Sequence, residues 1–276
     1  MKRNSLIICR GGGDLATGIV HRLHRAGFRV LVLETDHPAA IRRQVSFCEA
    51  VYEGKATVEG VTAQRIDSVS EMEEVFAGGC VPLFVDSKGA SIAELHPDVV
   101  VDAIIAKKNL GTTKEMAPLV IGVGPGFTAG EDCNCVVETK RGHTLGNVIW
   151  DGSAIPNTGV PGNVGGYSIE RLIKASADGV IEPKAVIGDL VRKGQIVAIT
   201  GGEPVYALMD GIVRGMLQPG VQVTKGLKIG DIDARAKQEH CRTISDKARA
   251  IGGGVLDAVC SYETVSYTHL RAHETG

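Results

Sequence analysis

Apolar residues along this chain recur with two different periods. Residues 6–9 form an uninterrupted apolar run, and 31–33 form another, as expected for buried strands. Between them Leu15, Ile19 and Leu23 recur at the spacing of one helix face. A helix capped by Ser70 is expected over 70–77, and further apolar runs predict strands at 81–85, 99–101, 119–121 and 136–138. Strands alternating with helices predict a mostly parallel sheet that extends to about residue 172.

The turn between the first strand and its helix has the pattern Gly-x-Gly-x-x-Ala, followed after the next strand by an acidic residue. This arrangement is typical of a Rossmann-like unit that binds a dinucleotide such as NAD(P). Glycines allow a sharp turn and a close approach of the pyrophosphate, and the acid accepts a ribose 2′-hydroxyl. The predicted cofactor-binding residues here are Gly11, Gly12, Gly13, Asp14, Ala16 and Glu34.

Asp14 leaves three interpretations open. Its carboxylate can cap the helix, in which case it competes with an anion for the same backbone N–H groups. Alternatively it contacts an amine or a metal near the phosphates, or the turn is purely structural. Glu34 favours a free 2′-hydroxyl, whereas Arg42 and Arg43 keep an NADP-type ligand open.

Three glycine-rich loops follow, at 122–130, 141–146 and 156–163. The first comes directly after a predicted strand, so Gly124 and Gly126 are expected at the ligand-binding edge of the sheet. His143 is a candidate catalytic acid or base, because imidazole titrates near pH 6.5. The alternative is that the loops are connecting turns and His143 bonds its own backbone.

An internal repeat with an offset of 32 residues follows the loops. It places 179–181 over 211–213 and Gly188 over Gly220. Two such halves predict an all-β barrel-sandwich hybrid, similar to biotinyl and lipoyl domains. The join at 200–209 has no Lys to carry a swinging arm, so a docking or lid role is expected instead.

The expected domains are 1–172 (Rossmann-like, nucleotide-binding), 173–235 (barrel-sandwich hybrid) and 236–262 (helical), with a helix broken by the glycines at 252–254. Residues 265–276 fit no pattern set upstream and are expected to be a non-native tail.

The composition of the chain limits the classes of partner that we expect it to bind. A formal net charge of −2 and 4% aromatic residues argue against nucleic-acid binding, and no apolar run is long enough to cross a bilayer, so we expect a cytoplasmic protein. Seven cysteines without regular spacing predict neither a disulfide framework nor a metal site. Cys133 and Cys135 form a lone C-x-C that is a hypothetical sulfur or selenium carrier.

Together with the glycine pattern, the segments 117–127, 141–143 and 228–233 resemble the YqeB family, also called selenium-dependent molybdenum hydroxylase system proteins. Asp233-Ala234-Arg235 departs from it, since the family has Asp-Pro-Arg. The first domain is similar to the Rossmann domain of XdhC/CoxI-type maturation factors. The resemblance implies an accessory factor for a molybdenum hydroxylase client, whose cofactor is often the molybdopterin dinucleotide. An NAD(P)-dependent oxidoreductase and a non-catalytic docking protein stay open as alternatives, and a homo-oligomer is compatible with each.

Overall fold

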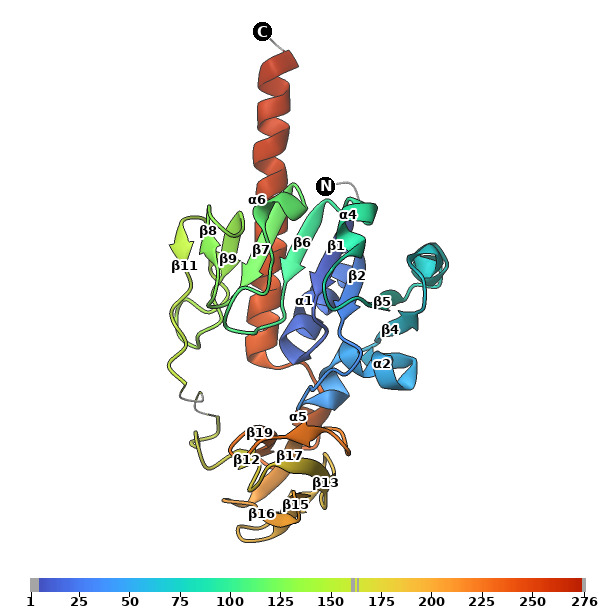
Figure 1. Cartoon of the computed structure of the whole chain (residues 1–276). Helices are drawn as coiled ribbons and strands as arrows, with labels where there is room; N and C mark the ends of the chain where they lie inside the picture. The colour runs from blue at the N-terminus through green and yellow to red at the C-terminus, as the bar shows by residue number, and fades with distance from the viewer. Residues whose placement is uncertain (1–4, 160–161, 163, 275–276) are drawn as a thin grey trace.

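The computed structural model describes residues 5–159, 162 and 164–274, with 263–274 described by their backbone alone. Figure 1 shows two parts, which we call the large-sheet body and, below it, the β module (172–233). In the described part, no helix is long and apolar enough to cross a membrane.

The large-sheet body is built on a nine-stranded mixed sheet. Seven central strands run parallel, and one antiparallel strand closes each edge. In spatial order the strands are β10 (Val148–Ile149), β9 (Cys135–Val137), β7 (Leu119–Val123), β6 (Val99–Asp102), β1 (Leu6–Arg10), β2 (Arg29–Glu34), β5 (Val81–Val85), β4 (Val61–Ile66) and β3 (Lys55–Val58). Beside them lies a two-stranded sheet of β8 (Thr128–Ala129) and β11 (Gly152–Ser153).

Apolar cores cover both faces of the large sheet. Successive side chains of a strand point to opposite faces, so Ile7 and Cys9 join one core and Ile8 the other. The first core is covered by α1 (Asp14–Arg25) and α6 (Asp246–Glu274), which pack side by side. The remaining helices are α2 (Ala50–Glu53), α3 (Met72–Ala77), α4 (Ser91–Leu95), α5 (Glu239–Arg242) and the 3-10 turns η1 (Arg43–Val45), η2 (Phe47–Glu49), η3 (Val69–Glu71) and η4 (Lys114–Met116).

The β module contains two four-stranded antiparallel sheets around a core of its own. The first sheet has the order β12 (Leu172–Lys174), β19 (Lys228–Asp233), β17 (Gly211–Met216) and β14 (Leu190–Val191). The second has the order β16 (Glu203–Tyr206), β15 (Ile196–Thr200), β13 (Gly179–Pro183) and β18 (Gln222–Val223).

The expected fold class, a Rossmann-like, mostly parallel sheet followed by an all-β barrel-sandwich hybrid, is wrong, although most strands of the large sheet are parallel. The large sheet is mixed, with an antiparallel strand at each edge, and β4 and β3 extend it beyond β5, unlike the classic six-stranded Rossmann sheet. The β module consists of two separate four-stranded antiparallel sheets, with one repeated segment in β13 and the other in β17. Apolar runs and turns locate strands, but they do not encode which strands pair or in which direction, and the class inferred from them failed for that reason.

The expected break at the glycines of 252–254 is also wrong, because α6 continues through them. The predicted helix over 70–77 is present but begins earlier. Its capping box is formed by Ser68 and Glu71, rather than by Ser70 and Glu73.

Candidate functional site

The glycine turn follows β1 at the carboxyl edge of the large sheet. Gly11 has a φ of +97°, and its N–H donates to the Leu33 carbonyl at 2.8 Å. A Cβ at Gly11 would lie 3.0 Å from the Ala103 carbonyl oxygen, after β6. Both the conformation and the close approach require glycine here. The turn therefore brings the start of α1 to the crevice between β1 and β6, where the strand order reverses.

Glu34 holds this turn in place. Its Oε1 accepts the Gly12 N–H at 2.8 Å, and its Oε2 accepts the Thr35 N–H at 2.7 Å. Burial raises the pKa of Glu34, although the two backbone N–H groups act in the opposite direction. Each carboxylate oxygen keeps a further lone pair, so the predicted ribose contact stays a prediction.

Gly13 leaves open space at the start of α1. A Cβ built there meets nothing within 4 Å, and its φ of −66° suits any residue. Packing therefore does not require glycine at this position. Gly13 is itself the N-cap, and Asp14 does not cap the helix but pairs with Arg42 at 3.5 Å. Ala16 is buried against the first core, as close packing of helix and strand requires.

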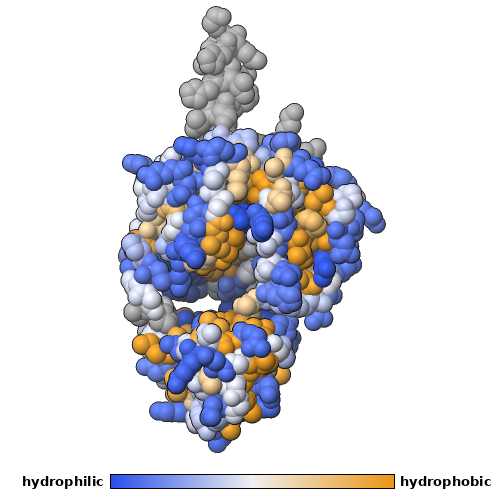
Figure 2. All heavy atoms as spheres, viewed as in Figure 1, coloured by the Kyte–Doolittle hydropathy of each residue, from blue (hydrophilic) through white to orange (hydrophobic). Residues whose placement is uncertain are grey.

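Two cavities meet at this turn. The smaller, of about 450 Å³, is lined by Arg10, Gly11, Glu34 and Asp86 among others. The larger, of about 820 Å³, lies between the large-sheet body and the β module, where Figure 2 shows the surface hollowed. Gly13 and Asp14 line both.

The larger cavity, called here the basic cavity, is strongly cationic. Two carboxylates line it, those of Asp14 and Asp231, against seven basic residues. The basic residues are Arg42, Lys140, Arg141, Arg171, Arg214, Lys228 and Lys247.

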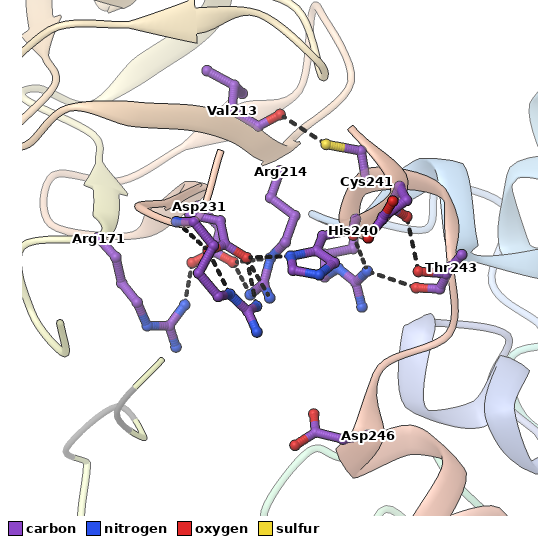
Figure 3. Close-up of polar contacts among 12 residues, drawn as sticks. Arg171, Val213, Arg214, Asp231, His240, Cys241, Thr243 and Asp246 are labelled. Atoms are coloured by element: carbon purple, nitrogen blue, oxygen red, sulfur yellow. Dashed lines mark hydrogen bonds and ion pairs between the residues drawn. The ribbon is translucent and has the colours of Figure 1, made fainter. Parts of the chain in front are cut away.

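On the β module, Asp231 organises the cationic wall of the cavity. Its carboxylate is buried and accepts hydrogen bonds from Arg171 and from Arg214, whose Nε lies at 2.9 Å (Figure 3). Lys228 Nζ lies 3.9 Å from the same carboxylate. The Nε of Arg171 is buried without a hydrogen-bond partner among the described residues.

On the opposite wall, Arg42 connects the two parts of the molecule. Its Nη2 donates to the carbonyls of His240 at 2.8 Å and Thr243 at 3.0 Å. In the described part of the chain its Nε is buried and also lacks a partner. Lys247, at the start of α6, is half-buried, and burial lowers its pKa. Beside it, the hydrogen bond from Arg141 lowers the pKa of Asp246 to about 2.

The structure does not bring the other predicted residues to this site. Gly124 and Gly126 line neither cavity. They are required by close packing, because a Cβ would lie 2.8 Å from Thr139 Oγ1 and 2.6 Å from the Lys108 backbone. His143 is exposed on a turn outside both linings. Part of the 156–163 loop lines the basic cavity, but residues 160, 161 and 163 lie outside the described residues.

The two cysteines of the C-x-C pair lie in different cores, Cys133 in the second and Cys135 in the first. Burial raises the pKa of Cys133 to about 11 and that of Cys135 to about 12. Both thiols are therefore poor nucleophiles near neutral pH, which argues against sulfur or selenium transfer there. Among the residues that the structure describes, no group of three His, Cys, Asp or Glu side chains could hold a metal ion.

Sequence reasoning missed the basic wall. Arg171, Arg214, Lys228 and Lys247 lie far apart along the chain. Only Lys228 lies in a segment named above, and that segment was used for a resemblance and not for its charge. Only Arg42, considered above for a 2′-phosphate, was singled out. A count of charges could not have found the cavity, since the chain as a whole is slightly acidic.

No protein-family model matches the chain. It is 48% identical over 256 residues to "Uncharacterized protein YqeB" of Escherichia coli (strain K12), a match that covers 93% of this chain and 47% of that protein. The chain spans about half the length of this relative. The similarity supports the resemblance to the YqeB family, and it says nothing about selenium, molybdenum or an XdhC-like domain.

Solved structures give only distant likenesses. An aspartoacylase family protein from Mesorhizobium loti is 11% identical, with a TM-score of 0.23 over 77% of this chain and 59% of that one. The ectoine utilization protein EutE (DoeB) from Ruegeria pomeroyi is 11% identical, with a TM-score of 0.24 over 83% and 86%. Likenesses this weak carry no argument about fold or function.

Proposed function

We propose that this chain binds a dinucleotide, either NAD(P) or the molybdopterin dinucleotide, across the glycine turn. The carrying observation is the open space at Gly13, where the small pocket and the basic cavity meet at the start of α1. The groups that would hold the ligand are Gly13 and the first backbone N–H groups of α1 for the pyrophosphate, and Glu34 for the ribose.

Electrostatics support an anion at this position. The N-terminus of a helix offers free N–H groups and the positive end of the helix dipole. Asp14 opposes an anion there, but its carboxylate is paired with Arg42. The net field at the turn is therefore set by the basic cavity beside it.

We further propose that the chain acts as an accessory or maturation factor for a molybdenum hydroxylase. Support comes from the resemblance to the YqeB family and to XdhC/CoxI-type factors, together with the similarity to YqeB of Escherichia coli. The chain covers only 47% of that relative, so the proposed role is assigned to the part of the relative that matches this chain. A cytoplasmic location and a hydroxylase client belong to the same proposal.

Dinucleotide binding is tested by calorimetric titration of NAD, NADP and the molybdopterin dinucleotide into the full chain and two variants. Gly13→Ala and Gly13→Asp should both fold, since a Cβ has room. We expect Gly13→Ala to weaken binding about tenfold, or ~1.4 kcal/mol, and Gly13→Asp to abolish it through repulsion. Ala93→Asp, which adds the same charge on an exposed position of α4, should bind as wild type.

The outcomes separate the alternative functions. Binding of the molybdopterin dinucleotide supports the maturation role. Binding of NAD or NADP alone favours a redox enzyme. A folded chain that binds none of the three overturns the proposal, and if it still co-purified with a hydroxylase, it would be a docking protein.

A further inference from the structure

The basic cavity extends well beyond the glycine turn and has cationic side chains on two facing walls. We propose that it binds a phosphate group, held between Lys228 and Arg214 of the β module, Arg171 immediately before that module, and Lys247 and Arg42 of the opposite wall. This inference goes beyond the proposed function: NAD and the molybdopterin dinucleotide have no phosphate besides the pyrophosphate assigned to the glycine turn, so the cavity takes a separate phosphate group or the terminal phosphate of a nucleotide.

The charges of the cavity are not balanced by its own carboxylates. Asp231 is shared by three basic side chains, and Asp14 neutralises Arg42 alone. No carboxylate of the described residues lies within 4.0 Å of Lys247 Nζ, and Lys247 makes none of the ion pairs of that part of the chain. A cationic excess in a partly closed space favours an anionic ligand.

Two buried donors support this conclusion. Arg42 and Arg171 both line the cavity, their side chains are 8% and 10% exposed, and each has an Nε without a hydrogen-bond partner among the described residues. A buried, unpartnered N–H of a charged group is costly, and an oxyanion in the cavity is the chemistry that would satisfy it. Burial also lowers the pKa of Lys228 and of Lys247, as expected for ammonium groups that lack a full counter-charge.

The donor set indicates a phosphate rather than a carboxylate. Planar guanidinium groups and lysines converge from both walls, so they can contact several oxygens of one group from different sides. The volume of about 820 Å³ leaves room for a ligand that also reaches the glycine turn. Because the two walls belong to different parts of the molecule, a phosphate would connect the β module to the large-sheet body.

The test uses two lysines from opposite walls. Inorganic phosphate is titrated into the full chain, and Lys228→Met and Lys247→Met are each expected to weaken its binding about tenfold. Neither substitution strips Asp231 of its arginines, so both variants should keep the wild-type melting temperature. Lys225→Met, an exposed lysine of the same module outside the basic cavity, is the matched control and should bind as wild type.

A second arm distinguishes a phosphate on the nucleotide ligand from free phosphate. ATP should bind about tenfold more tightly than ADP, and the Lys228→Met/Lys247→Met double variant should bind both equally. Phosphate binding that is lost in the variants, with no preference for ATP over ADP, identifies free phosphate as the ligand.

The inference is overturned if neither phosphate nor the terminal phosphate of ATP responds to the two lysine substitutions. This outcome is distinct from failure of the proposed function. If Gly13→Asp weakens ADP binding and the Lys228→Met and Lys247→Met substitutions do not, then nucleotide binding at the glycine turn is supported and only the phosphate site is overturned. Phosphate binding without any nucleotide binding would keep the phosphate site and overturn nucleotide binding at the glycine turn.

Discussion

At the scale of single residues, two buried carboxylates of β19 hold the cationic wall together. Asp231 and Asp233 are two positions apart, so their side chains lie on the same face of the strand. Asp231 accepts from Arg171 and Arg214, and Asp233 accepts from Arg235. Burial by itself raises the pKa of Asp233, but the hydrogen bonds from Arg235 and the charge of Arg214 bring it well below its usual value. Asp233 therefore stays ionised, and the two side chains together fix the guanidinium groups beside the cavity.

Asp231→Asn is expected to lower the free energy of unfolding by about 3–5 kcal/mol, because it leaves Arg171 buried without its counter-charge and leaves Arg214 with Asp233 alone. Urea unfolding at neutral pH measures the loss. Asp151→Asn, at an exposed position, is the control and should change stability by less than about 0.5 kcal/mol. A loss for Asp231→Asn no larger than that of the control would mean that water already screens the cluster.

At the scale of elements, helix α6 shows how tertiary packing overrides local propensity. Three consecutive glycines indicate a helix end, yet two of them lie where other backbone approaches closely. A Cβ on Gly252 would lie 2.5 Å from the Gly18 carbonyl oxygen, and one on Gly254 would lie 2.0 Å from that of Gly146. The glycines let α6 pack against α1 and the 142–146 turn. The sequence contains the glycines but not the partners that need them.

Alanine substitutions at two glycines of this helix are expected to change the stability of the protein in opposite directions. Gly253→Ala meets nothing within 4 Å, so it should stabilise the protein by up to about 1 kcal/mol through helix propensity alone. Gly254→Ala should destabilise it, because the helix and the turn must move apart. Thermal unfolding of the two variants beside wild type measures both effects. If both raised the melting temperature, the close packing of α6 would be wrong.

The parts of the site that could be predicted from the sequence are those encoded within one continuous segment. The glycine turn was found because Gly11, Gly13 and Glu34 are encoded within one strand–helix–strand segment, and the turn lies where expected. Gly124 and His143 lie outside both cavity linings, and their proposed roles stay predictions; a position after a strand, as for Gly124, does not say whether a residue faces the crevice. The basic wall combines residues from β17, β19, α6 and two loops, which only the folded chain brings together.

At the scale of the whole molecule, the loop after β2 connects the two parts. Ile41 packs against the core of the β module, and its carbonyl accepts the Met216 N–H at 2.8 Å. Arg43 Nε donates to the Met216 carbonyl at 2.8 Å, and Arg42 bonds the chain that follows α5. The loop therefore fixes the β module relative to the glycine turn and sets the width of the basic cavity between them.

Removal of this connection should make the two parts unfold separately. Arg42→Ala loses the hydrogen bonds to the His240 and Thr243 carbonyls, each worth about 1.5–3 kcal/mol when the donor is charged. We expect calorimetry without ligand to give one transition for wild type and two for the variant, since each part keeps its own core. Arg25→Ala, an exposed arginine at the end of α1, should leave the single transition unchanged. If Arg42→Ala also unfolds in one transition at the wild-type temperature, then the contacts of Ile41 and Arg43 suffice to couple the two parts, and Arg42 is free to serve the ligand alone.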